Sequence, residues 1–77
     1  MVFLTNTTCE GPHYSLEGSK ADLLRSTIEH CNNNKECSMV IVNNCDEADL
    51  KFFYCINGTP VFSSTACSWI KNEGRHN

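Results

Sequence analysis

Patterns that mark several common functional classes are missing from this sequence. No two of its six cysteines are spaced as C-x-x-C, which argues against a zinc ribbon or a thioredoxin-like site. Its histidines, His13, His30 and His76, lack metal-ligand spacing, so we expect no metal and no cofactor. Six basic side chains against nine acidic ones give a net charge of −3 without a basic patch. Nucleic acid is therefore not an expected partner.

Long apolar runs are missing too. No stretch reaches the roughly 20 apolar residues that a membrane-spanning helix needs, so we expect no membrane insertion. The opening residues 1–4 are too short to be the apolar core of a signal peptide. We expect the chain to be either a mature secreted protein or a domain excised from a longer ectodomain.

Catalytic patterns are also scarce. Asp46, Glu47 and Asp49 form an acidic cluster, but the calcium-binding spacing of an EF-hand and its glycine are missing, which favours a solvated loop. Residues 63–65 carry three hydroxyl groups without a nucleophile-elbow motif beside them. Cysteines held in disulfides would supply no thiolate. We therefore expect that the protein is not an enzyme.

The six cysteines are the most informative feature that is present. A chain of 77 residues buries a small core, so it is expected to need covalent cross-links, which persist in an oxidising compartment. Two sequons, at Asn6 and Asn57, make these residues candidate N-glycosylation sites. We expect a disulfide-rich glycoprotein that is secreted or forms the extracellular part of a cell-surface protein.

Six cysteines allow many pairings, and the sequence alone does not select one. The order of the predicted elements favours one bond across the helix-to-strand turn, one across the following loop, and one between the first segment and the last strand. The favoured pairs are Cys31–Cys37, Cys45–Cys55 and Cys9–Cys67. Two short closures would contribute roughly 2–3 kcal/mol each, and the long closure slightly above about 4 kcal/mol.

One amphipathic helix organises the predicted fold. Ser19 is a suitable N-cap, and Asp22 stands three residues later in the position of a capping box. The asparagine run 32–34 is expected to end the helix. Apolar side chains recur at helical spacing along one face. These are Ala21, Leu24, Ile28 and Cys31.

Short apolar segments surround this helix and predict strands. Residues 38–42 form a continuous apolar run that is typical of a central strand. In residues 50–56, alternation turns Leu50, Phe52, Tyr54 and Ile56 toward the helix. Asn57-Gly58 predicts a hairpin that returns residues 61–62 alongside. Further extended segments are expected at residues 1–8, 13–16 and 67–71.

The order of these elements predicts an α+β fold, with one helix packed on a small antiparallel sheet. Residues 1–77 are expected to form one domain, in which 72–77 is a frayed tail.

The stretch HCNNNKECSMVIVNNCDEADLKFFYCINGTPVFSSTACSWIK resembles the C-terminal two thirds of a PAN/apple-type module. Helix, cysteine, polar turn, cysteine, apolar strand, and a final serine–aromatic–aliphatic–lysine strand follow in that order, and the resemblance covers about residues 14–71. Many members carry a second helix cysteine where Asn34 and Lys35 stand here. The resemblance implies one helix on a sheet, chain ends held together, and binding of proteins or carbohydrates. It supplies no site residues.

Candidate binding residues are aromatic side chains that the predicted core does not use. Phe53 and Lys51 lie on the strand face opposite the helix, and Tyr14 precedes the helix in a polar context. We therefore expect an extracellular PAN/apple-like interaction module that binds a protein or a glycan. A free-standing secreted effector acting on a cell-surface receptor is the main alternative. A protease inhibitor would use residues 57–65 as bait, but this segment lacks a basic residue for trypsin-like enzymes.

Overall fold

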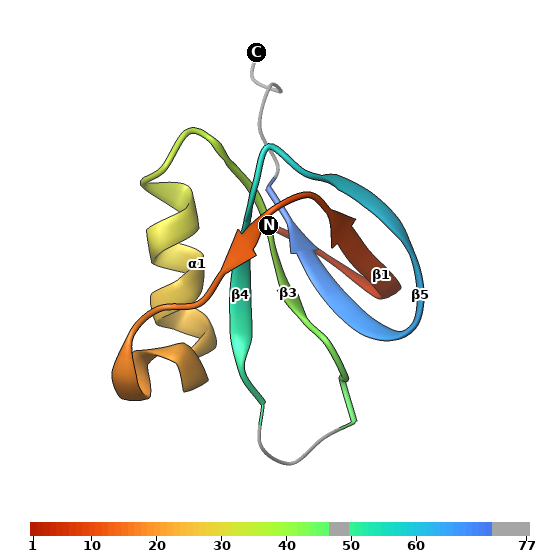
Figure 1. The fold of residues 1–77 in the computed structure, drawn as a ribbon, viewed down its shortest axis with the longest axis horizontal. Coiled ribbons are helices and arrows are strands. Elements are labelled where there is room, and N and C mark those ends of the chain that lie inside the picture. The colour runs from red at the N-terminus through yellow and green to blue at the C-terminus, as the bar shows by residue number, and fades with distance from the viewer. Residues whose placement is uncertain (47–49, 72–77) are drawn as a thin grey trace.

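The computed structural model describes residues 1–46 and 50–71 and has one helix layer against one sheet (Figure 1). Its five strands form a single antiparallel sheet in the order β1-β5-β3-β4-β2. The predicted α+β class is confirmed. The elements are β1 (Val2–Glu10), β2 (His13–Tyr14), the 3-10 helix η1 (Gly18–Asp22), α1 (Leu24–Asn32), β3 (Cys37–Val42), β4 (Phe52–Ile56) and β5 (Thr59–Ile70).

The helix is divided in two, so the predicted start at Ser19 is wrong. Leu23 is extended (φ −110°, ψ 112°) and separates η1 from α1, and neither N-terminus has a side-chain cap. The carbonyl of Leu23 instead accepts hydrogen bonds from the backbone N and the Oγ1 of Thr27, at 3.2 and 3.1 Å. The break allows Ala21 and Thr27 both to be buried while Leu23 remains exposed. The helix ends at Asn32, within the predicted asparagine run.

The sheet buries apolar side chains on both faces, and β3 lies at its centre, as predicted. On the face covered by α1, Val40 and Val42 pack with Phe52 and Cys31. The predicted alternation in residues 50–56 is confirmed, because Leu50, Tyr54 and Ile56 pack against this same cluster. On the opposite face, Met39 and Ile41 form a second cluster with Cys9 and Cys55. A strand buried on both faces explains the continuous apolar run.

The second cluster is covered by an arm formed from β1 and β5. Thr5 pairs with Cys67 and Thr7 with Phe62, so four residues of β5 oppose the single residue Asn6. Both strands bend at this bulge, and the paired segments beyond it, 7–10 and 59–62, form the arm (Figure 1). Residues 63–65, which carry three hydroxyl groups, lie within β5 at this bend. The buried Ser68 hydroxyl ties the bend by donating to the carbonyl of Thr7.

The predicted hairpin at Asn57-Gly58 is wrong, because β3 lies between β4 and β5 in the sheet. Residues 61–62 pair with β1 rather than with β4. Asn57 does adopt a positive φ of 53°, but Gly58 serves a different purpose. A Cβ atom on Gly58 would overlap both sulfur atoms of the Cys9–Cys55 disulfide. Glycine is therefore required here for the close approach of the backbone to a disulfide.

The three disulfides are Cys9–Cys55, Cys31–Cys37 and Cys45–Cys67. The predicted Cys31–Cys37 bond is confirmed, and the predicted pairs Cys9–Cys67 and Cys45–Cys55 are wrong. The reason is the sheet itself: Cys45 and Cys67 belong to the helix-side cluster, whereas Cys9 and Cys55 belong to the opposite one. Each wrong pair would have had to cross the sheet. The two ends of the described chain are held together by the pairing of Val2 with Ile70 instead.

Replacing Gly58 tests the packing of the arm. Gly58→Ala should lower the free energy of unfolding by about 3 kcal/mol or more, because the methyl group overlaps the disulfide. Gly18→Ala is the comparison, because a Cβ atom on Gly18 meets no neighbouring atom, although Gly18, unlike Gly58, has a positive φ (64°). Its cost should be roughly 1–2 kcal/mol, from backbone strain alone. Urea unfolding of both variants provides the measurement, and equal losses would contradict the packing.

Candidate functional site

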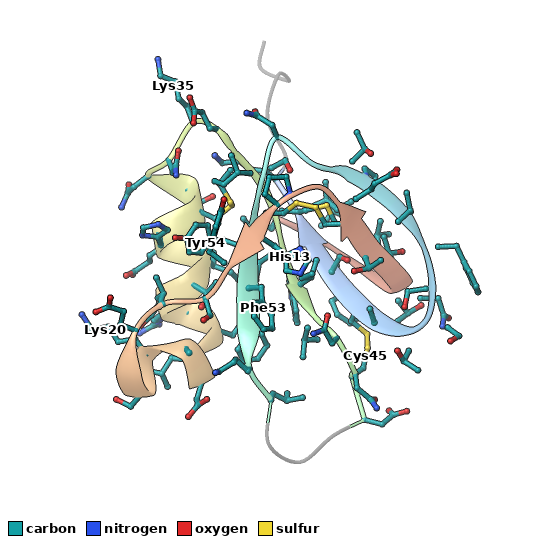
Figure 2. The ribbon with its side chains drawn as sticks, in the orientation of Figure 1. His13, Lys20, Lys35, Cys45, Phe53 and Tyr54 are labelled. Atoms are coloured by element: carbon teal, nitrogen blue, oxygen red, sulfur yellow. A yellow bond between two sulfur atoms is a disulfide. The ribbon has the colours of Figure 1, made fainter. Side chains whose placement is uncertain are left out.

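The structure separates the three predicted binding residues. Tyr14 on β2 pairs with Tyr54 on β4, on the face that α1 covers. Phe53 lies on the other face, half-buried against the second cluster, where His13 contacts it edge-on at 5.6 Å between ring centroids (Figure 2). Lys51 is exposed just before β4. Tyr14 therefore does not share a surface with Phe53, and it alone of the two aromatic residues is largely exposed, at 51%.

Three elements bring aromatic rings together beside the helix. The ring centroid of His30 on α1 lies 4.4 Å from that of Tyr54 on β4. The ring centroid of Tyr14 on β2 lies 5.9 Å from that of Tyr54. We call these three residues the ring row. Tyr54 is half-buried between its two exposed neighbours. The rings of Tyr14 and His30 are therefore exposed to solvent, and both pack against the half-buried ring of Tyr54.

A groove of about 270 Å³ adjoins the ring row, and we call it the helix groove. It lies between α1 on one side and, on the other, η1 together with the segment that precedes it. Its lining offers a cation, a carboxylate, an imidazole, an amide and a hydroxyl, which together donate and accept hydrogen bonds. The lining residues are Leu16, Lys20, Ser26, Glu29, His30 and Asn33.

The polar side chains of the helix groove are not used by the fold. Within residues 1–46 and 50–71, the side chains of Lys20, Glu29 and Asn33 form no hydrogen bond or ion pair with the protein. All three are exposed. Their hydrogen-bonding capacity is therefore available to a ligand.

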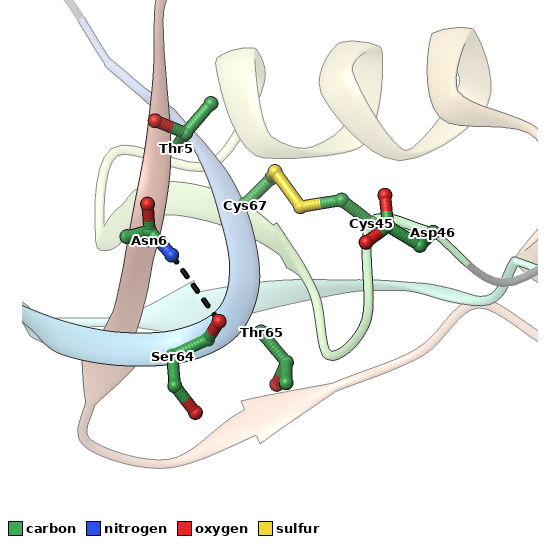
Figure 3. Close-up of a pocket in the computed structure, with 7 residues that line it drawn as sticks. All are labelled: Thr5, Asn6, Cys45, Asp46, Ser64, Thr65 and Cys67. Carbon is green, nitrogen blue, oxygen red and sulfur yellow. Dashed lines mark hydrogen bonds between the residues drawn. A yellow bond between two sulfur atoms is a disulfide. The ribbon is translucent and has the colours of Figure 1, made fainter.

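A second hollow, of about 230 Å³, lies inside the bend of β1 and β5 (Figure 3). Several of its polar groups are engaged in holding the bend, whereas the side chains of Thr5, Ser64 and Asp46 form no hydrogen bond within the described residues. Asn6 Nδ2 donates to the carbonyl of Ser64 at 3.2 Å, and Thr65 Oγ1 donates to the carbonyl of Asn43 at 2.9 Å. The backbone N of Cys45 donates to the carbonyl of Thr65 at 3.0 Å. This hollow is thus a consequence of the bend, and Asn6, Thr65 and Cys45 in its lining have a structural role.

Other predicted features can be placed only in part. Asp46 lines the bend hollow, whereas Glu47, Asp49 and the predicted tail 72–77 with His76 lie outside the described residues. No three metal-ligating side chains come together in the described part of the chain. The same part contains no helix long and apolar enough to cross a membrane. Asn6 and Asn57, the two sequon residues, are both exposed.

The sequence singled out Tyr14 as a candidate binding residue but not the two rings beside which it lies. His30 and Glu29 stand one turn or less from Asn33 on the polar side of the helix, which is a local signal for a shared surface. The pairing of Tyr14 with Tyr54 has no such local signal, because it depends on which strand lies at the edge of the sheet.

Comparison with known proteins gives no relative: no family model, no curated protein and no solved structure matches this chain.

Substitutions at Asn6 test the assignment of the bend hollow to structure. Asn6 has a φ of 53°, so Asn6→Gly should lose only the hydrogen bond to Ser64, at about 0.5–1 kcal/mol. Asn6→Ala should lose the same bond and add left-handed strain, for roughly 2 kcal/mol in total. Unfolding of unglycosylated protein in urea compares the two. An alanine variant as stable as the glycine variant would show that this backbone conformation is not required.

Proposed function

We propose that this chain is a non-catalytic extracellular interaction domain that binds a carbohydrate in the helix groove, against the ring of Tyr14. One observation carries the proposal: an exposed histidine lines a groove whose polar side chains form no hydrogen bonds within the described residues, and Tyr54 links that histidine to the exposed ring of Tyr14. Of the two ligand classes implied by the resemblance, carbohydrate is the one that these side chains suit better.

A sugar ring offers many hydroxyl groups and a flat patch of C–H bonds. Its hydroxyl groups both donate and accept hydrogen bonds, so a matching site needs donors and acceptors in a small space. Lys20 supplies donors, Glu29 supplies acceptors, and Asn33 supplies both. The C–H patch suits the face of Tyr14. A protein anchor would instead require a desolvated apolar pocket, which the helix groove does not provide.

The covalent structure supports an extracellular location. Three disulfides join all six cysteines, and such bonds persist in oxidising compartments. The single helix on an antiparallel sheet and the paired first and last strands agree with the expectation drawn from the PAN/apple resemblance. We therefore regard the chain as a PAN/apple-like module, and the two exposed sequons are compatible with a glycoprotein.

The inhibitor alternative loses support from the position of its bait segment. Within residues 57–65, Thr59 to Phe62 pair with β1 as part of the arm. A substrate-like inhibitor loop has to enter a protease cleft in an extended form without such a partner. The paired segment is therefore poorly suited to that role.

Glycan binding can be tested directly. An immobilised glycan array should identify a ligand, and titration calorimetry should then show at least about a tenfold loss of affinity for Tyr14→Ala, equivalent to roughly 1.4 kcal/mol. Glu29→Gln should also weaken binding, because it removes a charged acceptor. Phe62→Ala is the matched control: Phe62 is 80% exposed on the arm, away from the groove, and its loss should leave affinity unchanged. An unaltered Tyr14→Ala affinity would place the ligand elsewhere.

A further inference from the structure

The outer edge of β1 is the most unusual apolar surface of the protein. Residues 2–5 pair with β5 on one side, and β1 is the last strand of the sheet on the other. Val2, Phe3 and Leu4 are 48%, 51% and 39% exposed. We call these three residues the β1 edge. Their backbone N–H and C=O groups on the outer side have no partner strand among the described residues, which leaves them available for pairing.

Sheet edges in soluble proteins are normally protected by charge, proline, a bulge or a very short strand. The opposite edge of this sheet follows that rule, since β2 has only two residues and Pro12 precedes it. The β1 edge does not follow it. Residues 1–9 contain neither a charged residue nor a proline, and the bulge at Asn6 lies beyond the segment 2–5. One edge is therefore closed and the other is open.

We propose that the β1 edge pairs antiparallel with the β1 edge of a second copy of this chain, so that two sheets join into one. This edge suits a second copy, because its side chains are uncharged and can face those of another β1 edge without like-charge repulsion. A two-fold axis at Phe3 places Val2 of one copy opposite Leu4 of the other. Every cross-strand pair at the centre is then apolar, as a self-complementary interface requires.

Phe3 is already ordered for this contact. Its ring lies 5.0 Å from that of Trp69, which in turn lies 5.8 Å from Phe52 in the helix-side cluster. An aromatic side chain held by its neighbours loses little conformational entropy on association. The short paired segment buries less area than a standard interface, so the association is expected to be reversible and dependent on concentration.

This interface is separate from the helix groove. β1 and β2 form opposite edges of the sheet, and Tyr14 is on β2. Self-association would therefore leave the groove open, and the proposal stands whether or not the groove binds a sugar.

Sedimentation equilibrium over a wide concentration range tests the pairing. The native 8.7 kDa chain should shift from one to two chains, without larger species. Leu4→Lys should move this transition to at least tenfold higher concentration, and so should Val2→Glu, because each buries a charge beside an apolar residue. Phe62→Lys, a charge introduced at a side chain that is 80% exposed on the arm, should leave it unchanged.

A mixture of the Leu4→Lys and Val2→Glu chains provides the decisive experiment. In the proposed register the introduced lysine lies opposite the introduced glutamate, so the mixture should form dimers at concentrations where each variant alone is monomeric. Circular dichroism confirms that both variants are folded before mixing. A native chain that stays monomeric, a mixture that gains nothing, or an equal effect of Phe62→Lys would each overturn the proposal.

Discussion

The fold depends on how the arm of β1 and β5 is fastened over the second face of the sheet. Met39 and Ile41 point to that face and are buried there, although α1 lies on the other side of the sheet. The Cys9–Cys55 disulfide joins the end of the arm to β4, and Gly58 lets the backbone pass against it. Without that closure, apolar side chains at the centre of the sheet would face water.

The remaining disulfides follow from the same division into two faces. Cys45–Cys67 and Cys31–Cys37 both lie on the helix side, where one ties the loop after β3 to β5 and the other ties the end of α1 to β3. A domain of this size has too small a core to hold two separate apolar layers by burial alone. A disulfide on each face restricts the conformations of the unfolded chain, and this adds stability that the small core does not supply.

Patterns local in sequence predicted much of this fold. The apolar run in β3, the alternation in β4 and the asparagine run after α1 each specify their element within a few residues. The predictions that were wrong concern contacts between residues far apart in the sequence. The dipeptide Asn57-Gly58 is a strong hairpin signal, yet the chain uses its asparagine for a positive φ and its glycine for contact with a disulfide. The strand to which β5 returns is decided by the bend at Asn6, which has no local signature of comparable strength.

The wrong disulfides have the same origin. Pairing Cys9 with Cys67 assumes that the first and last strands meet near those residues, and the strands do meet. Their register, however, places Cys9 opposite Pro60 and Cys67 opposite Thr5, on opposite sides of the bulge at Asn6. The site shows a similar limit: Tyr14 could be chosen from its polar surroundings, but its place beside Tyr54 and His30 follows from β2 joining the edge next to β4.

The two edges of the sheet could act together in a sugar-binding protein. Hydrogen bonds in an open, polar groove replace bonds to water, so each adds little net free energy, and a single groove is expected to bind a sugar weakly. A dimer formed through the β1 edge would carry two grooves on one rigid sheet. A ligand with repeated sugars would then meet the second groove at a high effective concentration, which raises the overall affinity without any new contact. The proposed ligand site beside β2 and the proposed dimer contact at β1 are compatible, because β1 and β2 form opposite edges of the sheet.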